Sequence, residues 1–521
     1  MPNRREFLTA LVATSAAAAT KGFAKAAIAS AGLTSLVPRQ SSHAANYWCT
    51  WAVQNYVHGQ GQQSIDLAVL EGDSGGKLAH DAMSENALLA DGGWASSFYA
   101  RIRRDLFLLL DDGWETGGTA TFQLDPTKFH SFKGSNRARL RALNAAIEQR
   151  GWRGAALWCR NTPGGAEDLD LERECAGAGI RYWKIDIGDP NFNLIQARDK
   201  AGIPLMLEHV HGESPVNGNW TTDGRFGAQA WDSRRMEILR NTDVYRTYDV
   251  TSILSLPTTL DRTAEMLHSA AGHSELRSLL NVEDEVYVAA VLGCTMGVMR
   301  HPLHGLRPNG DPDLFFNGPR KAKQRMDEVV RALRWQRIAE PFPCGVGTFQ
   351  RSAEFLTDSW TFSAGETWEH ELVGATVRQS APAVIARNID LPIVSAEGER
   401  PFVFAARFPN GAVAVGAQER TIPGKAWYMP RCAVTLHVGD APGPVGIFGE
   451  FDRVTLTFAA VQRARRVIAQ DLAGDTPVDI TSLVEFEGAS LHLDGAVLRK
   501  VGLGLRTFGD LSSPAIVVAL I

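Results

Sequence analysis

The stretch Leu106-Phe-Leu-Leu-Leu-Asp-Asp-Gly-Trp114 is an apolar run that ends abruptly in two carboxylates. Two later runs also carry an acid at or next to their last residue. They are Tyr182-Trp-Lys-Ile-Asp-Ile187 and Val244-Tyr-Arg-Thr-Tyr-Asp249. Each run is too short for a typical helix and has the composition of a buried parallel strand. Residues that follow the strands of a parallel barrel gather at one rim of it. The sequence therefore predicts a barrel with several carboxylates at the C-terminal ends of its strands.

Short apolar runs alternate with amphipathic stretches between residues 44 and 340, which is the pattern of βα units. About eight such units predict an α/β fold of the (β/α)8 TIM-barrel type. An open, doubly wound sheet is the alternative, but no Gly-rich phosphate loop follows an early strand. Residues 341–521 contain short β-type runs divided by Gly, Pro and Asp. This spacing predicts a C-terminal antiparallel β-sandwich domain.

The N-terminus carries a targeting pattern. Asn3-Arg-Arg-Glu-Phe-Leu8 places two arginines before an Ala-rich apolar stretch, which predicts a twin-arginine export signal. The stretch is too short to span a membrane stably. We therefore expect residues 1–43 to be a leader outside the fold, the protein to be periplasmic or secreted, and no membrane association after the signal is removed.

Composition excludes some partners. The formal net charge is −5, and no basic block or basic patch interleaved with aromatic residues is present. This argues against nucleic acid and anionic membranes as partners and favours a neutral polyol such as a carbohydrate. The six cysteines show no CxxC spacing and are too scattered for a disulfide scaffold. The oligomeric state is left open by the sequence.

The acids at the strand ends suggest a specific chemistry. Lys184 and Asp186 lie two residues apart and therefore share one face of a strand. The lysine charge favours an ionised Asp186, as a nucleophile requires. Burial against Tyr245 and Tyr248 could raise the pKa of Asp249, as a residue that donates and then accepts a proton requires. One ionised and one protonated carboxyl group facing each other are what glycosidic bond cleavage needs.

Four segments resemble motifs of a known family. They are Tyr47-Trp-Cys-Thr-Trp51, Leu110-Asp-Asp-Gly-Trp114, Trp183-Lys-Ile-Asp186 and Tyr245-Arg-Thr-Tyr-Asp249. In combination they look like the signatures of the retaining α-galactosidases of glycoside hydrolase families 27 and 36, with their raffinose-synthase-like members. The resemblance implies a retaining exo-glycosidase that removes a terminal α-linked galactose, or a stereochemically related sugar, by double displacement and without a cofactor.

Residue roles carry over by position. The resemblance implies Asp186 as nucleophile and Asp249 as acid/base. Its implied substrate contacts are Asp111 and Asp112 to the 4- and 6-hydroxyls, Lys184 to the 3- and 4-hydroxyls, Arg246 near the 2-hydroxyl, and apolar walls from Trp51, Trp114 and Trp158. Glu208 and His209, at the end of the fifth predicted strand, complete the expected substrate-binding set.

Departures from the family pattern leave alternatives open. The spacing before Asp249 differs by one residue from common family 27 forms, so Asp243 is a second candidate acid. The segment Glu208-His-Val-His-Gly212 stands in place of a Cys-rich segment and contains an H-x-H pair. With Glu208, Asp186 or His301, His209 and His211 could make the chain a metal-dependent hydrolase instead. A sugar-binding protein without catalysis is the third reading.

Overall fold

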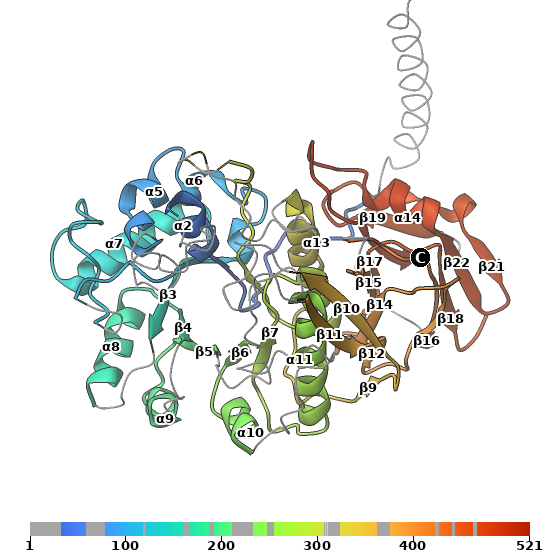
Figure 1. The fold of residues 1–521 in the computed structure, drawn as a ribbon, viewed down its shortest axis with the longest axis horizontal. Coiled ribbons are helices and arrows are strands. Elements are labelled where there is room, and N and C mark those ends of the chain that lie inside the picture. The colour runs from blue at the N-terminus through green and yellow to red at the C-terminus, as the bar shows by residue number, and fades with distance from the viewer. Residues whose placement is uncertain are drawn as a thin grey trace, which may run out of the picture.

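The computed structural model describes residues 33–58, 79–117, 121–160, 166–186, 192–210, 233–246, 255–306, 308, 310, 324–361, 376–421, 427–439, 443–461 and 466–521. Figure 1 shows one unit built from strands β1–β8 with their helices, and a second unit of C-terminal sheets beside it. Helices α11 and α13 lie where the two units meet.

Eight parallel strands form the first sheet, in the order β7-β6-β5-β4-β3-β2-β1-β8. They are β1 (Tyr47–Cys49), β2 (Phe107–Leu110), β3 (Ala155–Arg160), β4 (Tyr182–Asp186), β5 (Met206–Val210), β6 (Val244–Arg246), β7 (Leu279–Asn281) and β8 (Gly297–Val298). A parallel bridge between Asn281 and Thr295 joins β7 to the residues just before β8. The Thr295 N–H donates to the Leu280 carbonyl at 2.8 Å. The sheet therefore closes on itself, and the predicted (β/α)8 barrel is confirmed over the open alternative.

Helices connect the strands in the expected alternation. They are α2 (Trp51–His58), α5 (Glu85–Leu89), α6 (Trp94–Ser97), α7 (Asn136–Gln149), α8 (Ala166–Gly177), α9 (Phe192–Ala201), α10 (Ser233–Arg240), α11 (Ser255–Ala270), α12 (Val286–Leu292) and α13 (Met326–Gln336). The start of α7 is an example of a helix end defined by the local sequence. The Ser135 hydroxyl accepts a hydrogen bond from the Ala138 N–H and caps the first turn. Among the described residues, no helix has the length and apolar composition needed to cross a bilayer.

Side chains alternate between the two faces of each barrel strand. Tyr47, Leu109, Trp158 and Tyr182 belong to a buried cluster inside the barrel. Their sequence neighbours face the surrounding helices and belong to the larger core, as Trp183 does beside Tyr182. This two-sided burial explains why the strand sequences are almost continuously apolar.

The C-terminal unit has an eight-stranded sheet, a five-stranded sheet and the hairpin β10 (Phe355–Thr361) with β11 (Thr376–Pro382). The eight-stranded sheet contains β9 (Phe349–Arg351), β12 (Val384–Arg387), β14 (Phe402–Arg407), β15 (Val413–Gln418), β17 (Val445–Phe448), β19 (Val467–Asp471), β20 (Val478–Asp479) and β23 (Ala515–Leu520). The five-stranded sheet contains β13 (Ile393–Ser395), β16 (Ala433–Gly439), β18 (Arg453–Phe458), β21 (Glu485–Glu487) and β22 (Ser490–Asp494). Helix α14 (Gly495–Gly502) packs against β19, β22 and β23.

The sheets of this unit are mixed, so the expectation of a purely antiparallel sandwich needs correction. The pairs β12–β14, β15–β17 and β16–β18 are parallel. In each pair the intervening strand lies in the opposite sheet, so the chain crosses over and returns in the same direction. Strand composition does not record which sheet a strand joins, and therefore does not record its direction.

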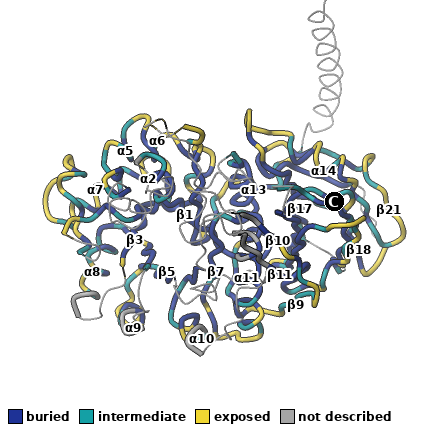
Figure 2. Tube along the Cα trace, viewed as in Figure 1, coloured by how far each residue is buried: buried dark blue, intermediate teal, exposed yellow. Residues whose placement is uncertain are grey.

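Helices α12 and α13 connect the barrel to the eight-stranded sheet. Trp335 on α13 packs edge-on against Phe408 and Phe448, and Tyr287 on α12 also contacts Phe448. Figure 2 shows buried chain running through this junction. Helix α13 ends at Gln336 and β9 begins at Phe349, so the predicted domain boundary at residues 340/341 falls between them.

Residues 35–43 belong to the folded part of the chain. The Leu36 N–H donates to Gln470 Oε1 at 2.7 Å, and Val37 is buried. The Ser42 N–H donates to Asp105 Oδ1 at 3.1 Å. The expectation that all of residues 1–43 lie outside the fold is therefore wrong for this stretch. The arginine pair and the Ala-rich segment lie outside the described residues, and the export signal stays a prediction.

The junction also contains buried ion pairs, which give the first testable prediction. Arg331 Nε lies 3.0 Å from Asp471 Oδ1, and the Asp471 side chain is 7% exposed. Asp471→Asn leaves the buried guanidinium without its charge partner, so we expect a loss of about 3–5 kcal/mol in the free energy of unfolding. Chemical denaturation measures this loss.

Asp475→Asn is the matched control, because Asp475 pairs with Arg334 but is 81% exposed. We expect it to cost less than about 1 kcal/mol. Equal losses in the two variants would show that burial of the Arg331–Asp471 pair does not matter for stability.

Candidate active site

A buried ion pair joins two strands at the C-terminal end of the barrel. Lys184 Nζ on β4 lies 2.8 Å from Asp111 Oδ2, just beyond β2, and the two side chains are 3% and 4% exposed. The Cys49 thiol donates to the same oxygen at 3.0 Å, and the Asp112 N–H donates to Oδ1 at 2.9 Å. Burial would raise the pKa of Asp111, but Lys184 and these hydrogen bonds outweigh it and hold the pKa below its ordinary value. Asp111 is therefore ionised at neutral pH.

Asp186 is the last residue of β4 and shares the inward face with Lys184. Trp158 on β3 donates its Nε1–H to Asp186 Oδ2 at 3.1 Å. The charge of Asp186 acts on both Lys184 and Arg246, and it favours the protonated form of each. Asp186 thus lies at the rim, next to an indole and within electrostatic range of two cations.

Asp111 and Asp112 point in different directions, as expected for neighbours on one strand. Asp112 Oδ2 lies 2.5 Å from His80 Nε2, and the Asp112 side chain is 19% exposed. Gly113 follows with φ +105°, where a Cβ would lie 2.7 Å from the His80 Cα. Only glycine fits this turn, because any side chain would collide with the backbone of His80.

Arg246 and Glu283 form a second buried ion pair, with both side chains 3% exposed. Arg246 ends β6, and Glu283 lies two residues beyond β7. Residues 279, 281 and 283 alternate onto the same face, and Asn281 contacts the interior residue Glu208, so Glu283 also faces the inside of the barrel.

Glu208 lies deeper in the barrel and joins its strand to three others. Its carboxylate accepts from the Tyr47 hydroxyl at 2.9 Å, the Tyr182 hydroxyl at 2.6 Å and the Asn281 amide at 2.6 Å. Burial raises its pKa, although Arg246 and these three donors oppose the rise. Glu208 therefore crosslinks strands beneath the rim, and its contact with substrate stays a prediction.

Two sequence expectations are wrong in position. Trp114 is completely buried in the core outside the barrel, where its Nε1–H donates to the Trp158 carbonyl at 2.9 Å. His209 faces outward, because its neighbour Glu208 faces inward, and its Nδ1 lies 3.2 Å from the Thr242 hydroxyl. Neither side chain lines the inside of the barrel with Asp186.

Other expected residues do reach the site. Trp158 belongs to the interior cluster, and Trp51, at the start of α2, packs partly buried against that cluster. Asp249 and His211 lie outside the described residues. Within the described ranges, no group of three or more His, Cys, Asp or Glu side chains has the arrangement of a metal site.

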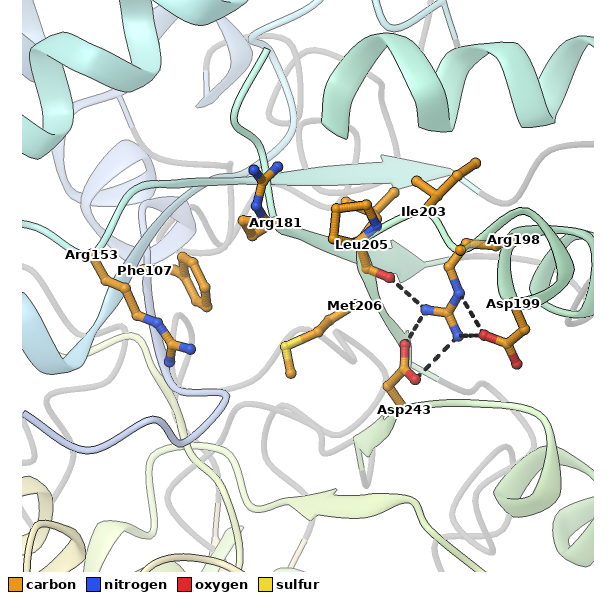
Figure 3. A pocket seen from close by; sticks show the side chains of 11 residues that line it. Phe107, Arg153, Arg181, Arg198, Asp199, Ile203, Leu205, Met206 and Asp243 are labelled. Carbon is orange, nitrogen blue, oxygen red and sulfur yellow. Dashed lines mark hydrogen bonds and ion pairs between the residues drawn. The ribbon is translucent and has the colours of Figure 1, made fainter. Parts of the chain in front are cut away.

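Asp243, the second candidate acid, lies at the opposite end of the barrel. It precedes β6 and lines a cavity of about 500 Å³ together with residues that precede β3, β4 and β5. Figure 3 shows its carboxylate in contact with two nitrogens of the Arg198 guanidinium. Asp243 also accepts from the Leu207 N–H at 2.8 Å. Because the strands separate it from the rim that carries Asp186, Asp243 is excluded as its catalytic partner.

Three residues at the site were missed by sequence reasoning. Cys49 lies inside the Tyr47–Trp51 motif but was given no role there, and His80 belongs to none of the four motifs. Glu283 does have a signal, because the apolar run Leu279-Leu-Asn-Val282 ends in Glu283-Asp284-Glu285. This is the same pattern of a buried strand followed by acids that marked Asp111 and Asp186.

Comparisons with known proteins show only distant likenesses. No protein-family model matches the chain, and no curated protein matches it. Among solved structures, a sugar phosphate isomerase/epimerase from Parabacteroides distasonis aligns with a TM-score of 0.27 and 11% identity, covering 59% of this chain and 100% of its own. A glycoside hydrolase family 30 subfamily 8 xylanase from Clostridium acetobutylicum aligns with a TM-score of 0.26 and 9% identity, covering 92% of this chain and 96% of its own. A gamma-CGTase from an alkalophilic Bacillus clarkii aligns with a TM-score of 0.25 and 11% identity, covering 88% of this chain and 80% of its own. At these scores the likenesses carry no argument about activity.

Glu115, which follows Trp114, yields a prediction about pH. Its Oε2 accepts from the Phe122 N–H at 2.7 Å and the Thr121 hydroxyl at 3.2 Å. Burial nevertheless raises its pKa from 4.5 to about 7. Between these two values the folded chain keeps a proton that the unfolded chain releases, so rising pH destabilises the fold across this interval. Glu115→Gln cannot ionise and should raise Tm relative to wild type at pH 8, with little difference at pH 4.

Thermal unfolding of both proteins across this pH range measures the effect. Glu485→Gln, at an exposed position on β21, is the control and should shift Tm equally little at each pH. A difference between Glu115→Gln and wild type that does not change with pH would contradict the assignment.

Proposed function

We propose that this chain is a retaining glycoside hydrolase that removes a terminal α-linked galactose or a stereochemically related sugar. The observation that carries the proposal is Asp186, an inward-facing carboxylate at the rim, hydrogen-bonded by Trp158 and flanked by the charges of Lys184 and Arg246. A nucleophilic carboxylate is what covalent glycosidase catalysis needs, and Lys184 and Arg246 place positive charge around Asp186. The indole of Trp158 offers an apolar surface for the C–H face of a sugar.

In the proposed reaction, Asp186 attacks the anomeric carbon while a second carboxyl group protonates the leaving oxygen. The glycosyl bond to Asp186 forms as the bond to the leaving oxygen breaks. The second group then removes a proton from water, which attacks the anomeric carbon and releases Asp186. Asp249 is our candidate for that group, on the strength of its place after β6 and its resemblance to the family 27 and 36 acid. Retention requires the two carboxyl groups to lie about 5–6 Å apart.

The remaining contacts support recognition of sugar hydroxyls. Asp111 and Lys184 hold each other in place, and each has hydrogen-bonding capacity beyond that contact. Asp112 diverges from Asp111 and is more exposed, so the two carboxylates can reach different hydroxyls of one sugar. We propose Arg246 near the 2-hydroxyl and Trp51 beside the apolar edge of the site.

The metal-dependent alternative is less well supported. It required His209 and His211 to act with an interior acid, but His209 faces away from Glu208 and Asp186. Export by the twin-arginine route stays part of the proposal. Only the N-terminal sequence pattern supports it. A screen of nitrophenyl α- and β-glycosides tests the function, and turnover of β-glycosides alone would exclude it. Binding of sugars without turnover of any glycoside would favour the non-catalytic reading.

Substitution of Asp186 is the direct test of the nucleophile. We expect Asp186→Ala to lower kcat on an activated aryl glycoside by at least about a thousandfold, since covalent catalysis contributes several kcal/mol. The Tm should stay near that of wild type. The exposed Asp475→Ala serves as control and should retain full activity. A loss of less than about tenfold in Asp186→Ala would remove Asp186 as nucleophile.

Asp112→Asn tests sugar identity. Charge-assisted hydrogen bonds are worth about 1.5–3 kcal/mol, so we expect kcat/KM for the preferred glycoside to fall by about tenfold to a few hundredfold. Asp112 is preferable to Asp111 for this test, because Asp111→Asn would also leave the buried Lys184 unpaired. Labelling of Asp186 by a 2-fluoro sugar should remain detectable at high concentration. Unchanged discrimination between galactosides and glucosides in this variant would show that the preferred sugar belongs to another class.

A further inference from the structure

Two buried cations share the inward face with Asp186, and each pairs with a carboxylate that follows a different strand. Lys184 lies two residues before Asp186 on β4, and Arg246 pairs in register with Val210 on β5, the strand between β4 and β6. Lys184 pairs with Asp111, which follows β2. Arg246 pairs with Glu283, which follows β7. In the described part of the chain, neither cation makes its ion pair with Asp186, although the charge of Asp186 acts on both.

Within the described residues, the ion pair with Arg246 is the contact that the Glu283 carboxylate makes. Its carboxylate accepts no hydrogen bond from the described residues, so its contact with Arg246 is what holds it there. Its neighbour Asp284 has a separate role, since its Oδ1 accepts from the Met299 N–H at 2.9 Å. Glu208, the other acid near Arg246, already accepts from Tyr47, Tyr182 and Asn281.

We propose that Glu283 is a positioning residue that keeps Arg246 from forming a direct ion pair with Asp186. This inference rests on the proposed function, in which Asp186 is the nucleophile. A guanidinium paired directly with Asp186 would take up the lone pairs that attack the anomeric carbon and lower their nucleophilicity. Arginine is prone to do this, because its planar fork matches a carboxylate in a two-point contact. With one edge occupied by Glu283, Arg246 supplies positive charge at a distance and keeps another edge for a substrate hydroxyl.

The arrangement makes a clear prediction for Glu283→Gln, studied in the full mature chain. Arg246 should turn toward Asp186, so kcat on aryl glycosides should fall by about tenfold to a hundredfold while KM changes less than about threefold. The acid limb of the kcat/KM profile should move to lower pH, because the variant lacks one negative charge beside Arg246. Among the described residues, Lys184 on β4 and Arg160 and Trp158 on β3 also lie beside Asp186 and are unchanged in the variant. Glu283→Asp should restore most of the activity and the position of the acid limb.

A crystal structure of Glu283→Gln gives a readout that does not depend on activity. The Arg246 guanidinium should lie within hydrogen-bonding distance of Asp186 in the variant and against Glu283 in the wild type. Asp471→Asn is the control for the loss of a buried ion pair elsewhere, and should lower stability without moving the pH profile.

Three results would overturn the inference. One is an Arg246 guanidinium that stays in place in the variant. Another is a Glu283→Gln enzyme that resembles Asp471→Asn, with reduced stability and an unmoved acid limb. The third is restoration of Glu283→Ala turnover by azide, which would make Glu283 itself the acid/base. Failure of the proposed function is distinguishable, because it shows as no turnover of any α-glycoside by the wild type, whereas the position of Arg246 in the crystal structure still decides the role of Glu283.

Discussion

The buried ion pair between Lys184 and Asp111 is the constraint on which the candidate site depends. Removing two charges from water costs several kcal/mol per ion, and mutual attraction offsets this only when further hydrogen bonds satisfy the remaining atoms. The Cys49 thiol and the Asp112 N–H supply such bonds to Asp111. The pair therefore ties the ends of β1, β2 and β4 together and sets the direction in which Asp112 leaves the strand.

Similar polar crosslinks run around the inside of the barrel. Glu208 joins β5 to Tyr47 on β1, Tyr182 on β4 and Asn281 on β7, and the Arg246–Glu283 pair joins β6 to the residues after β7. The Glu208 carboxylate is hydrogen-bonded on both oxygens, and a buried network of this kind favours a single arrangement of the groups it connects. The rim is thus built on rigid strands, and this is the setting in which precise placement of a nucleophile is achieved.

The C-terminal unit supports this arrangement from outside. The predicted site residues that the structure describes lie in the barrel, whereas the C-terminal sheets contact α12 and α13, on either side of β8. Arg387 on β12 donates to the Leu292 carbonyl at the end of α12 at 2.8 Å. We infer that these contacts stabilise the last βα units, where the barrel closes.

The sequence by itself determined the (β/α)8 barrel and the inward direction of Lys184 and Asp186, because the strand period of two and the alternation of strand and helix are local properties. It also marked the acids that follow strands, and the same rule applied to Glu283-Asp284-Glu285 would have found the partner of Arg246. Asp243 precedes its strand instead of following it, so the same local rule places it at the far face of the barrel.

Only the tertiary structure decided which of these groups are held by other contacts and where each side chain lies. Glu208 accepts hydrogen bonds from three other strands, the Trp114 side chain lies in the outer core with its indole N–H bonded to the Trp158 carbonyl, and β17 runs parallel to β15 because β16 lies in the other sheet. Each outcome depends on contacts between residues far apart in the chain. Those contacts follow from register and packing between elements, which the local pattern of one segment does not contain.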